Sequence, residues 1–213
     1  TSFTNSFVST ALCCPSHSTF LTGQYPHNHG VFDNKEPGGG VTSFNDSSTL
    51  ATWLHNVGYR TGHVGKYLNV YGTNESATST KDDPTYIPPG WDDWQALAGK
   101  STYRVYDYEV NDNGTLVSYG TSPLDYQTDV LTSRANAFIN EAEINDIQPF
   151  FLVVTPLAPH LESVGPLMSG CILSKWRQTI RPAPRHIGTL PASITVPNPS
   201  SFNESNVSDK PSW

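Results

Sequence analysis

The stretch Leu12-Cys13-Cys14-Pro15-Ser16-His17 decides how the rest of the chain is interpreted. Its proline and hydroxyl residues are typical of a first helical turn, and Gly23 and Pro26 predict where that helix ends. Residues 3–12 are mostly small and apolar and predict a strand or a buried approach to Cys13. The thiol is therefore expected just before a helix, where free backbone amides favour an anion. Two buried structural cysteines are the alternative.

Regular elements are predicted on the carboxyl side of this block. The pattern predicts helices over 50–57 and 125–144, strands over 61–64 and 150–154, and a hairpin over 103–119 around Asn113-Gly114. Because strands alternate with helices, the sequence predicts an α/β layered sheet. The continuous apolar run Phe150–Val154 is typical of a strand buried on both faces. Residues 72–90 predict a long surface loop.

Composition excludes several classes of protein. The chain has 213 residues and a net charge of −7, which argues against a nucleic-acid partner. No apolar run reaches the roughly 18 residues of a membrane span, so no membrane partner is expected. Three cysteines exclude a disulfide-dense scaffold. The chain starts at Thr1 without a signal-peptide pattern and ends at Trp213 in no recognisable element, so we expect a piece of a longer protein.

Two further blocks carry candidate chemistry. Gly65-Lys66 follows a predicted strand, and Ala158-Pro159-His160 follows the apolar run at 150–154. Residues at the carboxyl ends of strands in open α/β sheets line the usual ligand crevice. Taken separately, each block is also explained by an exposed lysine on a turn or a histidine in a loop.

Together, the three blocks resemble the formylglycine-dependent type I sulfatase family, closest to its branch of fungal arylsulfatases and N-acetylglucosamine-6-sulfatases. Further segments fit that branch: Leu21-Thr22-Gly23-Gln24-Tyr25, His27-Asn28-His29-Gly30-Val31, Gly65-Lys66-Tyr67-Leu68-Asn69, Pro88-Pro89-Gly90-Trp91, residues 125–131 and Pro149-Phe150-Phe151. The resemblance implies an alkaline-phosphatase-like α/β sandwich with a mixed, mostly parallel sheet. We expect the Phe150–Val154 strand to be central, and the sheet to be incomplete because its first strand is missing.

The resemblance also implies the chemistry. Cys13 corresponds to the residue that a formylglycine-generating enzyme oxidises to the nucleophile, which is also a ligand of Ca²⁺. Lys66 would hold a sulfate oxygen, and His160 would lie near the leaving oxygen or assist the breakdown of the sulfated intermediate. The implied activity is that of a sulfuric ester hydrolase acting on an aryl sulfate, a sulfated glucosamine or a sulfated polysaccharide.

The sequence departs from the family at two points. His17 stands where the family has the arginine that holds the formylglycine. The family's aspartates for calcium cannot be placed, and Asp82-Asp83 and Asp92-Asp93 are interpreted as solvated loop residues. A catalytically inactive fragment or pseudo-enzyme, at most anion-binding, is therefore the alternative. A Cys–His metal module lacks the required ligand spacing.

The expected organisation is a partial sulfatase catalytic domain over 1–213. Within it, 162–180 is a suspected aberrant insertion that carries Cys171, and 182–213 is an irregular surface segment. Five Asn-X-Ser/Thr sequons suit a glycoprotein that is secreted or lysosomal: Asn45, Asn74, Asn113, Asn203 and Asn206.

Overall fold

The computed structural model describes residues 5–76, 79–160, 162–164 and 177–179. The chain divides into a unit of residues 1–181 and a unit of residues 182–213. The predicted irregular segment 182–213, its two sequons and Cys171 lie outside the described residues.

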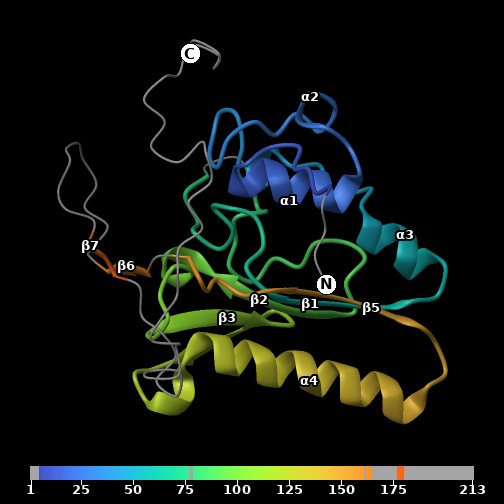
Figure 1. Cartoon of the computed structure of the whole chain (residues 1–213), viewed down its shortest axis with the longest axis vertical. Helices are drawn as coiled ribbons and strands as arrows, with labels where there is room; N and C mark the ends of the chain where they lie inside the picture. The colour runs from blue at the N-terminus through green and yellow to red at the C-terminus, as the bar shows by residue number, and fades with distance from the viewer. Residues whose placement is uncertain (1–4, 77–78, 161, 165–176, 180–213) are drawn as a thin grey trace. The chain divides into compact units, whose positions relative to one another are not determined.

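A five-stranded mixed sheet forms the middle layer, in the order β4-β3-β2-β1-β5 (Figure 1). β1 (Arg60–Gly65) pairs in parallel with both β2 (Asp93–Ala98) and β5 (Phe150–Thr155). β3 (Tyr108–Asp112) and β4 (Thr115–Tyr119) extend the sheet as an antiparallel hairpin. The predicted mixed α/β sheet is confirmed, with its parallel part confined to β1, β2 and β5.

Helices cover both faces of the sheet. α1 (Cys13–Thr22), α2 (Pro26–His29) and α3 (Leu50–Asn56) lie on one side, and α4 (Gln127–Asn145) lies on the other (Figure 1). α1 ends where Gly23 takes a left-handed conformation with φ 67°, as the sequence predicts. Shorter 3₁₀ and strand elements complete the described residues: η1 (Val41–Ser43), η2 (Gly99–Ser101), η3 (Pro123–Asp125), and the antiparallel pair β6 (Glu162–Val164) and β7 (Arg177–Thr179).

Each face of the sheet has its own apolar core. Alternate residues of β2 point to opposite sides, so that Trp94 joins the cluster beneath α1 while Leu97 joins the cluster on the α4 side. On the α4 side, Gly62 allows the ring of Phe138 to approach, since a Cβ at this position would lie 2.6 Å from it. The sheet is thus held between two helical layers, which leaves its strand ends free to carry a site.

Three expectations were wrong in detail. The strand at 150–155 is at the sheet edge, and its Val154 is 43% exposed, because no described strand pairs with its outer side. The described residues of the segment 3–12 form no strand. β2 was missed because Asp93 and Gln95 interrupt its apolar pattern.

Candidate active site

The parallel pairing of β1 with β5 brings two sequence-predicted blocks to the same edge of the sheet. Gly65 is in register with Thr155, so the residues after both strands emerge side by side. The Lys66 amide donates to the Thr155 carbonyl at 2.8 Å, and the Thr155 hydroxyl donates back to the Lys66 carbonyl at 2.7 Å. Gly65 has φ 118°, and a Cβ on it would lie 2.2 Å from the Thr155 oxygen, so this junction requires glycine.

Helix α1 supplies the thiol. Cys13 is its first residue and is half-buried, whereas Cys14 is fully buried and its amide donates to Asn34 Oδ1 at 2.9 Å. The side chain of Leu12, the residue before the helix, is apolar and cannot cap the free amides. The helix start therefore presents Cys13 with an environment that favours negative charge.

Lys66 is the cation next to that thiol. Its side chain is 8% exposed, and its Nζ donates to Asn69 Oδ1 at 3.2 Å. Burial lowers the pKa of Lys66, while the charges of Cys13 and Cys14 and a hydrogen bond with Cys13 act in the opposite direction. An ammonium removed from water in this way gains more from binding an anion than an exposed lysine does.

Tyr103 connects Lys66 to His160. The Lys66 Nζ lies 5.7 Å from the centre of the Tyr103 ring. The centres of the Tyr103 and His160 rings are 5.0 Å apart. Burial, followed by the charge of Cys13, raises the pKa of Tyr103 to about 12. His160 itself is exposed, just beyond β5. The structure thus brings Cys13, Lys66 and His160 into one site.

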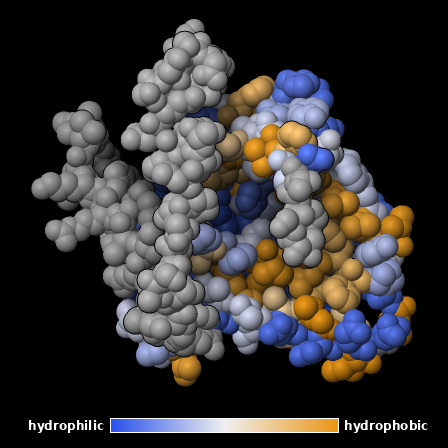
Figure 2. Space-filling view, viewed as in Figure 1, coloured by the Kyte–Doolittle hydropathy of each residue, from blue (hydrophilic) through white to orange (hydrophobic). Residues whose placement is uncertain are grey.

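His17 lies one turn after Cys13 and faces a cavity of about 430 Å³ between α1 and the strands β1 and β5. Figure 2 shows a hollow between the α1 layer and the sheet, with hydrophobic residues gathered along its sheet side. Burial, followed by the charge of Lys66, lowers the pKa of His17 to about 4. At neutral pH, His17 is therefore uncharged and cannot replace the charge of an arginine.

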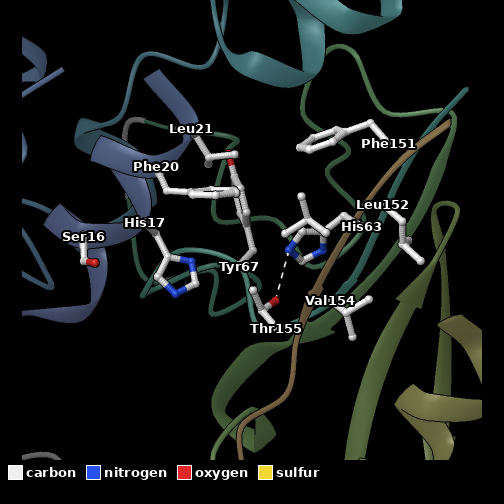
Figure 3. Close-up of a pocket in the computed structure, with 11 residues that line it drawn as sticks. Ser16, His17, Phe20, Leu21, His63, Tyr67, Phe151, Leu152, Val154 and Thr155 are labelled. Carbon is white, nitrogen blue, oxygen red and sulfur yellow. Dashed lines mark hydrogen bonds between the residues drawn. The ribbon is translucent and has the colours of Figure 1, made fainter. Parts of the chain in front are cut away.

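His63 lines the same cavity from β1 (Figure 3). It is 2% exposed, stacks on Trp94 at 4.6 Å, and shares a 3.4 Å hydrogen bond between its Nε2 and the Thr155 hydroxyl. Its buried Nδ1 has no hydrogen-bond partner among the described residues. Burial, followed by the charge of His17, lowers the pKa of His63 to about 3. The two histidines that line the cavity are therefore uncharged at neutral pH.

The described residues do not fit a calcium ion at Cys13. No group of three or more Asp, Glu, His or Cys side chains capable of holding a metal occurs among them. The closest charged partner of the thiol is the Lys66 ammonium, whereas calcium requires six or more oxygen ligands. Asp82 was wrongly expected to be solvated: it is 1% exposed and accepts from the Ser76 amide at 2.7 Å.

Three residues near this site had no role in the sequence interpretation. Asn69 was noted only as part of the glycine–lysine block, and its spacing of three from Lys66 is the one available signal. Tyr103 was assigned to a strand, and His63 was counted as a strand residue, so no pattern in the sequence identified either.

The three described sequon asparagines are exposed, but they differ in their contacts. Asn45 Oδ1 accepts from the Ser47 hydroxyl, so its amide nitrogen is not the bonded atom. Asn113 Nδ2 instead donates to Asp93 at 3.0 Å, and its Oδ1 accepts from the Trp94 amide. Modification of Asn113 would therefore cost the hairpin a side-chain bond, which is not so at Asn45.

Comparison with known proteins identifies the family to which this chain is similar. The Sulfatase family model matches residues 1–167. A putative extracellular sulfatase Sulf-1 homolog of Caenorhabditis elegans is 40% identical over 164 residues, covering 75% of this chain and 21% of that protein. The N-acetylglucosamine-6-sulfatase of Homo sapiens is 35% identical over 164 residues, covering 74% of this chain and 28% of that protein.

A solved structure agrees in fold. The structure of BT4656 in complex with its substrate D-glucosamine-2-N,6-O-disulfate is 27% identical, with a TM-score of 0.56, and the match covers 74% of this chain and 27% of that one. The match thus spans between about a fifth and just over a quarter of the length of these relatives. Among the described residues, no helix has the length and apolar character that crossing a membrane requires.

Proposed function

The chain belongs to the sulfatase family, and from that premise we propose that its parent protein is a hydrolase that cleaves a sulfate ester at the site formed by Cys13, Lys66 and His160. The observation that carries the proposal is the contact between a buried ammonium and the residue at a helix start. The Lys66 side chain is 8% exposed and hydrogen-bonds with Cys13. The sulfate group of an ester is an anion and requires such local positive charge, because the chain as a whole carries a charge of −7.

Cys13 is proposed as the residue that a formylglycine-generating enzyme modifies. The hydrated aldehyde supplies an oxygen nucleophile for sulfur, which a thiol does not. The half-buried position of Cys13 leaves room for a substrate beside it, whereas Cys14 is fully buried and serves packing.

The other residues have separate tasks. Lys66 holds a sulfate oxygen and offsets the charge that develops on it as the ester bond lengthens. His160, exposed beyond β5, delivers a proton to the leaving oxygen, so that the alcohol departs neutral. His17 stays uncharged and helps to form the wall of the cavity. No step is assigned to calcium, because the described residues do not fit it.

A sulfated saccharide is the proposed substrate class. The relative from Homo sapiens acts on N-acetylglucosamine 6-sulfate by name, and BT4656 was solved with a sulfated glucosamine as its substrate. Aryl sulfates are the convenient probes of the same bond. An extracellular relative also favours secretion of the parent protein, with glycosylation at the exposed Asn45 and Asn74.

We further propose that residues 1–213 are part of a sulfatase catalytic domain and that 162–180 is an insertion in it. Within it, residues 162–164 and 177–179 pair with one another as antiparallel strands. A transcript that joins Leu161 directly to Arg181 would support this assignment. Mature transcripts that always retain the segment would refute it.

The test of function uses the full chain expressed with a formylglycine-generating enzyme. Mass spectrometry of the Cys13 peptide should show the aldehyde, and Cys14→Ser should leave that conversion intact. Cys13→Ser should abolish both the conversion and the hydrolysis of an aryl sulfate. An unmodified Cys13 and no hydrolysis would refute the enzymatic assignment for this chain.

Anion binding without turnover is the second candidate. It is favoured by the absence of a metal-binding group among the described residues and by the neutral His17. Sulfate binding that depends on Lys66, with no hydrolysis even after Cys13 has been converted, would support it.

A further inference from the structure

Two residues behind Lys66 connect it to the rest of the site. Asn69 Oδ1 accepts from Lys66 Nζ at 3.2 Å, and Asn69 Nδ2 donates to the Tyr103 hydroxyl at 2.9 Å. Asn69 thus bridges the ammonium and a tyrosine that is 34 residues away in sequence. The function proposed above gives neither Asn69 nor Tyr103 a task.

The donor and acceptor inventory fixes the direction of these bonds. An ammonium can only donate, so the Asn69 oxygen faces Lys66 and its NH₂ group faces Tyr103. The Tyr103 hydroxyl therefore acts as an acceptor toward Asn69 and keeps its own proton for another partner. Among the described residues, no side chain accepts a hydrogen bond from the Tyr103 hydroxyl. Burial raises the pKa of Tyr103 to about 12, so the proton is present throughout the physiological range.

The position of Tyr103 suits an anion held by Lys66. Its ring centre lies 5.7 Å from Lys66 Nζ and 5.0 Å from the ring of His160. The charge of Cys13 contributes to the raised pKa of Tyr103, which places the thiol and the phenol in the same electrostatic environment. The groups around the ammonium are therefore Cys13, Cys14 and His17 from α1, with Asn69, Tyr103 and His160 from the loops at the carboxyl ends of the strands.

We propose that Lys66 and Tyr103 form a two-donor clamp for one sulfate group and that Asn69 is the positioning residue that sets both donors. This inference deepens the proposed function and rests on it. Lys66 supplies the charge, and the Tyr103 hydroxyl donates a hydrogen bond to a second sulfate oxygen. Asn69 touches no substrate. It acts by accepting a hydrogen bond from the Lys66 ammonium and by donating one to the Tyr103 hydroxyl oxygen.

The first experiment measures the affinity of the full chain for inorganic sulfate by calorimetry. Tyr103→Phe retains the ring between Lys66 and His160 but removes the donor, and should weaken sulfate binding about tenfold, the usual effect of a lost hydrogen bond to a charged group. Tyr59→Phe is the matched control, because Tyr59 precedes β1 at the opposite end of that strand. Its affinity for sulfate should equal that of the unaltered chain.

The second experiment addresses Asn69 without any ligand. In a chain labelled with ¹⁵N-lysine, a buried and hydrogen-bonded ammonium gives an NMR signal that is protected from solvent exchange. The Lys66 signal, assigned by its disappearance in Lys66→Met, should be lost in Asn69→Ala and retained in Tyr103→Phe. A residue with a merely structural role would change the melting temperature without removing this one signal, so thermal melts of all variants accompany the spectra.

The outcomes separate this inference from the function beneath it. If Lys66→Met binds sulfate as well as the unaltered chain, or the unaltered chain binds none, the proposed function loses its site and the clamp fails with it. If Lys66→Met weakens binding but Tyr103→Phe does not, the clamp alone is wrong. A Lys66 signal that persists in Asn69→Ala would remove the positioning role of Asn69.

Discussion

Acid should destabilise this protein through one buried histidine, His63. Its ring is 2% exposed and packs against Trp94, Tyr67 and Trp91. Burial lowers the pKa of His63 from 6.5 to about 3, so the unfolded chain binds a proton at this position well before the folded chain does. Stability is therefore unaffected above pH 6.5 and is lost as the pH falls from there toward 3.

The magnitude follows from these two pKa values. Between pH 7 and pH 5, the unfolded histidine becomes almost fully protonated while the folded one stays neutral. Linkage then gives a loss of ~2 kcal/mol in the free energy of unfolding from this residue alone. Such a loss is a sizeable part of the roughly 5–15 kcal/mol by which a typical domain is stable.

His63→Phe isolates this effect. Phenylalanine keeps an aromatic ring against Trp94 and removes both the titration and the buried Nδ1 that has no described partner. Urea unfolding followed by tryptophan fluorescence at pH 7 and pH 5 gives the free energies. His63→Phe should lose ~2 kcal/mol less than the unaltered chain over this interval.

An equal loss in His63→Phe and in the unaltered chain would refute the reasoning. His17 adds an acid loss of the same sign, since its pKa is also lowered, to about 4. The test therefore compares the free energy of unfolding of His63→Phe with that of the unaltered chain at each pH, so that the contribution of His17 is common to both.

Three further predictions concern the framework. Gly65→Ala should lower the free energy of unfolding by about 3 kcal/mol or more in urea unfolding, because the added Cβ would clash with the Thr155 carbonyl oxygen. Gly58→Ala is the control: Gly58 has φ 90° but open space around it, so the substitution should cost only the backbone strain. Arg134→Met should cost about 2 kcal/mol in the same assay, since its guanidinium bonds to both strands of the hairpin. Peptide mapping after expression in a secretory host should find Asn113 unmodified, because its amide nitrogen already donates to carboxylates.

Local patterns were sufficient to predict the elements that contain their own signals. The helix at Cys13–Thr22 follows from a proline in its first turn and a glycine at its end, and Asn113-Gly114 fixes the hairpin. The strand at 150–155 was predicted correctly, but its place in the sheet was not. An apolar run reports the burial of its side chains, whereas strand order depends on which neighbours pair with it.

The same distinction explains the site. Lys66 and His160 could be placed together from sequence because each follows a strand, and parallel strands deliver their carboxyl ends to one edge. Tyr103 belongs to a loop after η2, and no periodicity predicts how a loop folds back over that edge. Its contact with Asn69 exists only in three dimensions.

Burial also determines the electrostatics of the site. It is the largest cause of the lowered pKa of Lys66, whose ammonium bonds to Asn69 and, through it, is linked to Tyr103. His17, in contrast, is uncharged at neutral pH because burial, followed by the charge of Lys66, lowers its pKa to about 4. The described residues thus place the Lys66 ammonium beside Cys13, whereas His17, one helical turn after Cys13, carries no charge at neutral pH. A sulfate group bound here is therefore held mainly by Lys66 and by the neutral donors around it, which makes its binding sensitive to the residues that position that one ammonium.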